Sequence, residues 1–472
     1  MSILLLSVLL SAPAFGNELP ELGDASQGAL SPLQERRFGE AIMRQIRTSP
    51  AYLDDSEVAD YLNAIGYRLV ASGPEPGGHF EFFAIDDNSV NAFALPGGYI
   101  GVHSGLLLTA QSESELASVL GHEIAHVTQR HIARMIAAQQ RSGLASMAAL
   151  AVAILAARSN AQLSQAAIVA AQAGSIQSAL NFSREHEREA DRIGLQIVDK
   201  SGFDAHAMPV FLERLQRSSR LYEGGAPSYL RTHPLTFERV ADVQNRTQSI
   251  PFRQVPDSRE FHLVRARLQA AQGTPREAVE HFDTRLRDKK YMNEAAMHYG
   301  RVVALMRAND LKQATEAMPD LQRLADDHPM VKALAADVLV RSGDLEQGLT
   351  LYEEALRAHP SRRALVFGYA RSLLERGRPQ QAVEFLSNQL ERGPVEARHY
   401  ELQARGYDAL GQKLMRHRAQ AEAYLLKGSL ARAIEQLRLA QSSGDGDFFQ
   451  QSSVEARLRE LIALDADQRR RD

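Results

Sequence analysis

The stretch Ser112-Glu-Ser-Glu-Leu-Ala-Ser-Val-Leu-Gly-His-Glu-Ile-Ala-His126 combines a helix start with the spacing of a metal site. Ser112 and Glu115 predict a capping box that opens a helix, and the apolar residues after them recur with helical spacing. Residues four apart on a helix share a face, so His122 and His126 can bind one metal ion. Glu123 can then reach a water on that ion without being a ligand. The alternative is an ordinary helix with a solvated face of His and Glu.

A further ligand has to come from His, Asp or Glu, because the chain of 472 residues contains no Cys. The acidic segment Ser183-Arg-Glu-His-Glu-Arg-Glu-Ala-Asp191 predicts a second helix, on which Glu187 and Asp191 share a face. One of these carboxylates can ligate the metal, and the other can accept the free ring N–H of a ligand His. Spacing alone does not choose Glu187 over Glu185 or Glu189, and a salt-bridged surface helix is the alternative.

The composition is that of an ordinary globular protein, with 44% hydrophobic and 24% charged residues. The length predicts two or three domains. A formal net charge of −4 gives no electrostatic footprint for nucleic acid. A chain without Trp and with 6% aromatic residues also offers few platforms for base stacking. We therefore expect no nucleic acid among the partners.

Residues 1–16 predict a secretory signal peptide, with an apolar core from Ile3 to Leu10 and small residues before a cleavage site at Asn17. This segment lacks the Lys or Arg that usually precedes the apolar core, and a buried N-terminal strand is the alternative. The most apolar run elsewhere, 144–157, is shorter than the about 20 residues that a membrane-spanning helix needs. We therefore expect an exported protein with at most peripheral membrane contact.

Several shorter elements are expected before the first motif. Apolar spacing predicts helices over 32–46 and 56–70, and 79–85 has the pattern of a strand. Residues 91–103 contain two short strand pieces bent at Pro96. This segment is interpreted as an edge strand to which an extended substrate adds, with an internal hairpin as the alternative.

Residues 135–180, between the two motifs, are rich in Ala, Gln and Ser and helical in propensity. They are interpreted as a movable cover over the cleft, as an apolar surface for unfolded substrates, or as plain core packing. Further helices are expected to end at Gly202, near Arg220 and near Asn245, and residues 249–258 are expected to form a linker.

From about residue 259 onward the sequence repeats with a period of 34 residues. Gly343-Asp-Leu-Glu-Gln-Gly348 recurs as Gly377-Arg-Pro-Gln-Gln-Ala382. Less complete copies pair a turn residue with a small residue five positions later: Gly273 with Ala278, Asn309 with Ala314, and Gly428 with Ala433. This pattern resembles the tetratricopeptide repeat and predicts a solenoid of about four to six helix pairs. An unrelated helical bundle is the alternative.

The two motifs together resemble a known family of metallopeptidases. His-Glu-x-x-His at 122–126, followed by Glu-x-x-Ala-Asp at 187–191, is similar to the gluzincin peptidases of the CAAX prenyl endopeptidase and HtpX type. The segment Asn91-Ala-Phe-Ala-Leu-Pro-Gly-Gly-Tyr-Ile-Gly-Val102 and the extension Thr-Gln-Arg-His131 are also similar to that family. The resemblance implies a mainly α fold, in which a helical gluzincin protease domain with a small β-sheet precedes an α-solenoid of tetratricopeptide-like repeats.

The resemblance also implies roles for the residues of the motifs. It makes His122, His126 and Glu187 the ligands of one Zn²⁺ per chain. Glu123 becomes the general base of peptide hydrolysis, and Asp191 becomes the second carboxylate, which orients a ligand His.

Three more residues near the motifs are candidates for a role. His131 lies five residues after His126, so it points away from the ligand face and is interpreted as structural. His233 precedes Pro234, which makes its backbone extended, and the family has this Thr-His-Pro element near the metal. It donates a hydrogen bond to the oxyanion, or occupies the open metal position as a gate, or only caps its loop; the gate is slightly favoured. Arg239 is a second candidate for stabilising the oxyanion.

A signal peptide (1–16), a zinc metalloprotease domain (17–255) and a repeat domain (256–472) occur here in the order found in periplasmic proteases with a chaperone-like role, which this chain resembles. The resemblance implies a periplasmic endopeptidase that degrades misfolded or stalled outer-membrane proteins. It also implies contact with the outer-membrane assembly machinery through the repeats. The alternative is an assembly chaperone or scaffold that acts mainly by binding, with the protease largely silent.

Overall fold

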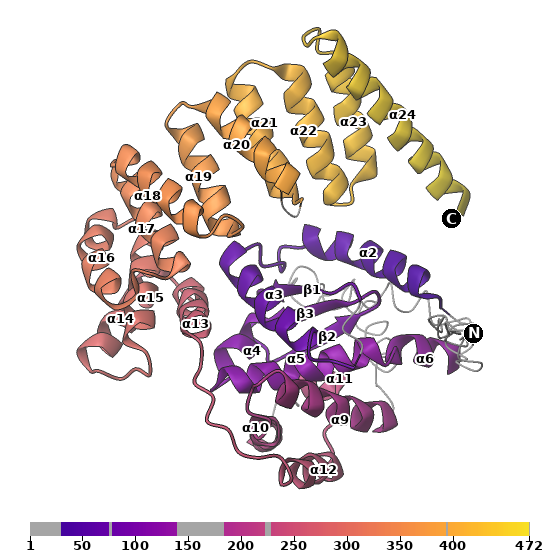
Figure 1. The fold of residues 1–472 in the computed structure, drawn as a ribbon, viewed down its shortest axis with the longest axis vertical. Coiled ribbons are helices and arrows are strands. Elements are labelled where there is room, and N and C mark those ends of the chain that lie inside the picture. The colour runs from indigo at the N-terminus through magenta and orange to yellow at the C-terminus, as the bar shows by residue number, and fades with distance from the viewer. Residues whose placement is uncertain (1–29, 75–77, 139–183, 222–227, 393–394, 472) are drawn as a thin grey trace, which may run out of the picture.

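The computed structural model describes residues 30–74, 78–138, 184–221, 228–392 and 395–471. Figure 1 shows two parts, one built of helices around a small sheet and one built of paired helices that form an arc above it. The first part contains α2 (Pro32–Thr48), α3 (Ser56–Val70), β1 (Glu81–Ile85), β2 (Ala92–Leu95), β3 (Tyr99–His103), α4 (Ser104–Thr109), α5 (Glu113–Thr128), α6 (His131–Ala138), α9 (Arg184–Lys200), α10 (Ala207–Leu221), α11 (Ser228–Thr232) and α12 (Phe237–Thr247).

The second part consists, where it is described, of helices. They are α13 (Arg259–Ala271), α14 (Pro275–Arg287), α15 (Glu294–Arg307), α16 (Leu311–Ala325), α17 (Pro329–Ser342), α18 (Leu345–Ala358), α19 (Arg363–Glu375), α20 (Pro379–Arg392), α21 (Ala397–Ala409), α22 (Lys413–Leu426), α23 (Leu430–Gln441) and α24 (Phe448–Arg471). Across the described ranges, no helix has both the length and the apolar character needed to span a bilayer.

The sheet has three strands in the order β1-β3-β2, with β3 parallel to β1 and antiparallel to β2. The strands predicted within 79–85 and 91–103 are confirmed. The predicted edge position holds for β2, whereas β3 lies in the middle of the sheet. Helix α5 packs against β2, so this edge strand runs beside the helix that carries the first motif.

Helix α5 is buried on every side from Glu113 to His126, which excludes the alternative of a solvated His and Glu face. Its first turn is capped as predicted on one side, because the Ser112 hydroxyl accepts a hydrogen bond from the backbone N–H of Glu115 at 3.2 Å. The reciprocal half of the predicted capping box is wrong. The Glu115 carboxylate instead accepts from the backbone N–H of Gln111 and pairs with Arg214. Position 183, where the segment of the second predicted helix begins, lies outside the described residues.

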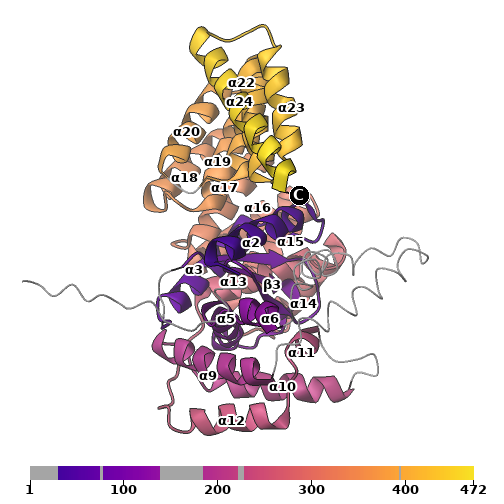
Figure 2. The ribbon, with the colours of Figure 1, turned by 90° about the vertical axis from the view of Figure 1, so that its right-hand side faces the viewer.

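Two glycines allow α5 and α9 to lie unusually close together. A Cβ atom on Gly194 of α9 would lie 2.9 Å from the backbone nitrogen of His122. A Cβ on Gly121 of α5 would lie 3.0 Å from Cγ2 of Val198. Because neither glycine carries a side chain, the two motif helices approach to near backbone contact. Helices α9, α10 and α12 form a layer on the side of α5 that faces away from the repeats (Figure 2).

The 34-residue period of the second part is confirmed by the turns within its helix pairs. Asn309, Gly343 and Gly377 have positive φ angles of 58°, 103° and 74°, and each lies between the two helices of a pair. Gly411, a further 34 residues on, has a φ of 72° between α21 and α22 and is a copy that the sequence pattern missed. Arg416 occupies the position five residues later, where the other copies have a small residue, and this hid the copy.

The repeats are fastened to the first part by ion pairs at its upper face. Arg362 of the repeats donates to Glu57 of α3 at 3.0 Å, and Arg267 of α13 donates to Asp55 at 2.7 Å. The end of the predicted linker (249–258) is also bonded to the first part, because the backbone N–H of Ser258 donates to the Glu113 carboxylate at 2.9 Å. The start of α5 is therefore bonded directly to the start of the repeats.

Candidate active site

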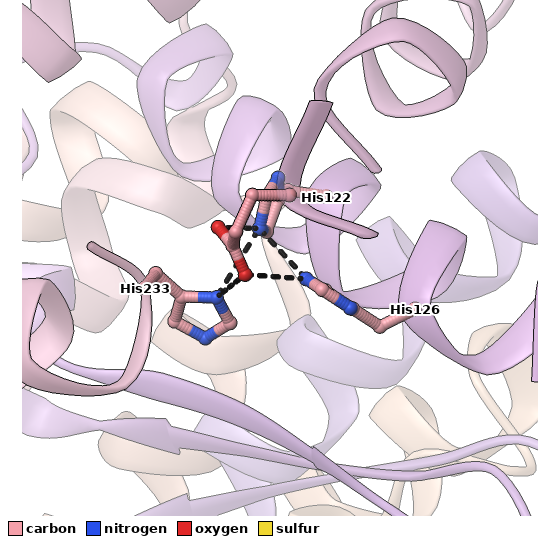
Figure 3. Close-up of side chains that lie close together, drawn as sticks. His122, His126 and His233 are labelled. Carbon is pink, nitrogen blue, oxygen red and sulfur yellow. Dashed lines mark hydrogen bonds and ion pairs between the residues drawn. The ribbon is translucent and has the colours of Figure 1, made fainter. Parts of the chain in front are cut away.

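Helix α5 presents two imidazoles to one point. His122 and His126 lie one helical turn apart, and their Nε2 atoms are 2.9 Å from each other. Figure 3 shows these two rings and that of His233 pointing toward one another. Each of the three side chains is 1% exposed, so the site lies in the interior of the protein.

Glu187 of α9 and His233, which follows α11, complete the cluster. The Glu187 carboxylate oxygens lie 3.5 Å from Nε2 of His122 and 3.5 Å from Nε2 of His126. Nδ1 of His233 lies 3.0 Å from Glu187 Oε1 and 3.3 Å from Nε2 of His122. One ligand atom from each of the four residues falls within 4.8 Å of all the others.

The donor atoms have the spacing of a metal site. Ligands about 2.1 Å from a tetrahedral zinc lie about 3.4 Å from one another, and the donor atoms of His122, His126 and Glu187 are separated by 2.9 to 3.5 Å. Two imidazoles and a carboxylate are a donor set of catalytic zinc sites. The side chains present therefore fit a zinc ion, and the fit does not require any of them to move far.

Asp191 and Arg239 lie immediately behind this cluster. Asp191 Oδ1 lies 3.0 Å from Nδ1 of His122, the ring nitrogen that faces away from the other donors. Arg239 pairs with both oxygens of Asp191, at 2.7 and 2.8 Å, and with Glu187 at 2.6 Å. Burial opposes ionisation of Asp191, but Arg239 outweighs it and holds the pKa of Asp191 below its usual value. The two carboxylates of α9 therefore share a face as predicted, and one guanidinium pairs with both.

Glu123 is fully buried beside the cluster, without being part of it. Burial raises the pKa of its carboxyl group, while His233 and His122 oppose that rise. Nε2 of His233 lies 3.4 Å from Oε1 of Glu123. No side chain among the described residues donates a well-aligned hydrogen bond to either carboxylate oxygen.

Tyr229 is a site residue that the sequence did not indicate. Its ring stacks on that of His233 with centroids 4.7 Å apart and an interplanar angle of 28°. Its backbone N–H donates to the carbonyl of Val90, just before β2, at 3.1 Å. Because α11 is a single short helix, this bond and the stacked ring set the position of His233. A Tyr four residues before the His was the only signal in the sequence.

Residues 56–247, which carry all of these side chains, match Peptidase family M48. The chain is also 34% identical over 462 residues to the β-barrel assembly-enhancing protease of Escherichia coli strain K12, covering 96% of this chain and 93% of the relative. The chain belongs to peptidase family M48. It is a metalloendopeptidase, and the resemblance to gluzincin peptidases drawn from its motifs is confirmed.

Other relatives support the same assignment. The putative β-barrel assembly-enhancing protease of Vibrio cholerae is 35% identical and matches 94% of this chain and 92% of its own length. The mitochondrial metalloendopeptidase OMA1 of Schizosaccharomyces pombe is 32% identical over 39% of this chain and 51% of the relative. Residues 339–406 match the tetratricopeptide repeat, which confirms the interpretation of the 34-residue period.

The ion cluster behind the site predicts a pH-dependent effect of Arg239→Met. Removal of the cation leaves Glu187 and Asp191 buried without their guanidinium partner, which costs about 3–5 kcal/mol of unfolding free energy at neutral pH. The pairs that depress the pKa of both carboxyl groups stabilise the wild type above about pH 4, and this contribution is lost as pH falls. The difference in unfolding free energy between the two proteins therefore narrows as the pH falls below about 4. Thermal unfolding of the two chelator-treated proteins over this pH range measures the difference in their unfolding free energies.

Arg188→Met is the matched control, because Arg188 lies on α9 beside Glu187 but pairs with Glu238 of α12, where both side chains are at least half exposed. Its loss should be at most about 1 kcal/mol at any pH. Equal losses for the two variants, or a gap for Arg239→Met that stays constant with pH, would contradict the proposed charge balance.

Proposed function

We propose that this metalloendopeptidase is zinc-dependent, with His122, His126 and Glu187 holding one Zn²⁺ per chain. The convergence of their buried donor atoms between α5 and α9 is the observation that carries the proposal. Zinc bound there supplies Lewis acidity, which polarises the scissile carbonyl and acidifies a water molecule. All other steps below belong to side chains of this protein.

Glu123 is proposed as the general base. Its carboxylate lies one residue beyond His122 on α5, next to the cluster but outside it, as proton transfer from an attacking water requires. The same carboxyl group then delivers the proton to the leaving amine. Asp191 accepts the Nδ1 proton of His122 and so fixes the ring in the orientation that presents Nε2 to the metal.

The substrate is proposed to bind as an extended strand along β2. This strand is at an edge of the sheet and packs beside α5. Burial raises the pKa of Glu123, and the backbone N–H of Ala94 on β2 is near enough to offset part of that rise. A peptide that adds to β2 through backbone hydrogen bonds therefore passes the general base, whatever its side chains are.

His233 is proposed as a gate. Its Nδ1 lies 3.0 Å from Glu187 and 3.3 Å from Nε2 of His122, so its imidazole would compete with water and substrate for a metal held by these residues. Arg239 is proposed to position Glu187 and Asp191, since those carboxylates and the carbonyl of Pro234 engage its N–H groups. This arrangement does not favour the oxyanion role that the sequence suggested for Arg239.

The biological role is proposed from the relatives that match nearly the whole chain and are named β-barrel assembly-enhancing proteases. We infer that residues 1–16 direct export to the periplasm, that 17–255 form the protease and that 256–472 bind the outer-membrane assembly machinery. The substrates are then misfolded or stalled outer-membrane proteins. A chaperone-like scaffold with a largely silent protease remains the competing function, and the first variant below separates the two.

Glu123→Gln should abolish proteolysis while leaving the metal site intact. The amide keeps the size of the side chain but cannot accept the proton, so cleavage of casein should fall by about 10²-fold or more. Metal content and binding through the repeats should equal those of the wild type. Cleavage at the wild-type rate would show that Glu123 is not the base. Full rescue of a deletion phenotype by this variant would favour the scaffold.

His233→Ala distinguishes the gate from an oxyanion donor, because the two roles predict opposite signs. If His233 closes the site, its loss raises basal cleavage and self-cleavage, and this is the expected result. An oxyanion donor would instead give a fall of about 10²–10³-fold in kcat. His206→Ala is the control, since His206 pairs with Asp204 outside the cluster. Rates equal to the control would leave His233 as a loop cap.

A further inference from the structure

The side of His126 that faces away from the cluster is covered by another imidazole. Arg130 adopts a left-handed backbone conformation with a φ of 51°, which ends α5 and starts α6 at His131. This turn brings the His131 ring back onto His126, with Nδ1 of one ring 2.8 Å from Nδ1 of the other. The His131 side chain is fully buried. The expectation that it points away from the ligand face is met, but it reaches the other edge of a ligand.

The contact continues outward to a carboxylate and a cation. Nε2 of His131 lies 3.2 Å from Oε2 of Glu189 on α9, and the same oxygen accepts from Arg134 of α6 at 2.8 Å. The ring of His186 stacks on that of His131, with centroids 4.5 Å apart and an interplanar angle of 18°. Hydrogen bonds at both ring nitrogens of His131 and the stacked ring of His186 therefore fix the orientation of its imidazole.

Hydrogen-bond chemistry gives this chain of groups one direction. Two facing Nδ1 atoms share a single proton, so one ring donates and the other accepts. If Nε2 of His126 is a metal ligand, which rests on the proposed function, its Nδ1 carries the proton and donates to His131. Nε2 of His131 then carries the second proton and donates to Glu189.

We propose that His131, oriented by Glu189, is a positioning residue that holds the ring of His126 with its Nε2 toward the metal. The two ligand rings of α5 are then supported in parallel ways. Behind His122 lie Asp191 and Arg239, whereas behind His126 lie His131, Glu189 and Arg134. Outer hydrogen-bond partners of this kind fix the tautomer and the orientation of a ligand imidazole.

The test measures the affinity of the protein for Zn²⁺ by competition with a chromogenic chelator. His131→Leu removes the acceptor and should weaken Zn²⁺ binding by about 10–100-fold. His131→Asn carries an oxygen close to the position of Nδ1, so it should restore most of the affinity. The absorption bands of bound Co²⁺ should shift in the Leu variant and return toward those of the wild type in the Asn variant.

A second pair of variants tests the outer end of the chain without touching a buried ring. Glu189→Leu removes the partner of His131 at a side chain that is 26% exposed, and should weaken Zn²⁺ binding by about tenfold. Glu185→Leu, at an exposed position on the same helix, removes an equal charge and should leave the affinity unchanged.

The outcomes separate this proposal from the one on which it rests. A wild type that binds no Zn²⁺ would contradict the proposed zinc site itself. If the wild type binds Zn²⁺ but His131→Asn and His131→Leu bind it with equal affinity, His131 contributes only packing and the proposal is contradicted. Equal affinities for Glu189→Leu and Glu185→Leu would overturn the support by Glu189, including where the Leu variant at 131 does not fold.

Discussion

The near-backbone contact between Gly121 of α5 and Gly194 of α9 is the constraint on which the site depends. One helix carries two imidazoles, and the other carries two carboxylates whose oxygens lie 3.0 to 3.5 Å from the ring nitrogens. A Cβ on Gly194 would collide with the backbone of His122 and push the helices apart. Short side chains such as Glu and Asp cannot bridge a wider gap between helices. The absence of two side chains therefore allows four others to converge.

This close packing buries charges, and the surrounding structure has to compensate them. Removing a carboxylate from water costs several kcal/mol after relaxation. Arg239 lies between Glu187 and Asp191 and pairs with both, and its guanidinium also donates to the carbonyl of Pro234. The same helix pair is held from outside, because the start of α5 is bonded to Ser258 at the start of the repeats. The repeats and the site are thus parts of one bonded framework.

Much of this architecture is visible in the sequence, since it follows from local periodicity. The helices over 32–46 and 56–70, the strand pieces within 79–85 and 91–103 and the 34-residue period were predicted close to where they are observed, whereas the short helices α4 and α11 were not predicted. Features that depend on contacts between residues distant in sequence were not predicted. The acceptor role of Glu115 toward Gln111 reflects its pairing with Arg214, and the stacking of Tyr229 depends on the position of α11. The turn at Arg130 has no Gly or Pro to announce it, so His131 was expected on a continuing helix.

Anomalous diffraction at the zinc absorption edge, from crystals of protein purified without chelators, tests the central claim most directly. The account predicts one zinc peak per chain inside the cluster, about 2.0–2.2 Å from Nε2 of His122, Nε2 of His126 and an oxygen of Glu187. A cluster without a zinc peak, in protein that is folded and has its α5 and α9 in contact, would contradict it. So would a zinc ion bound by other residues.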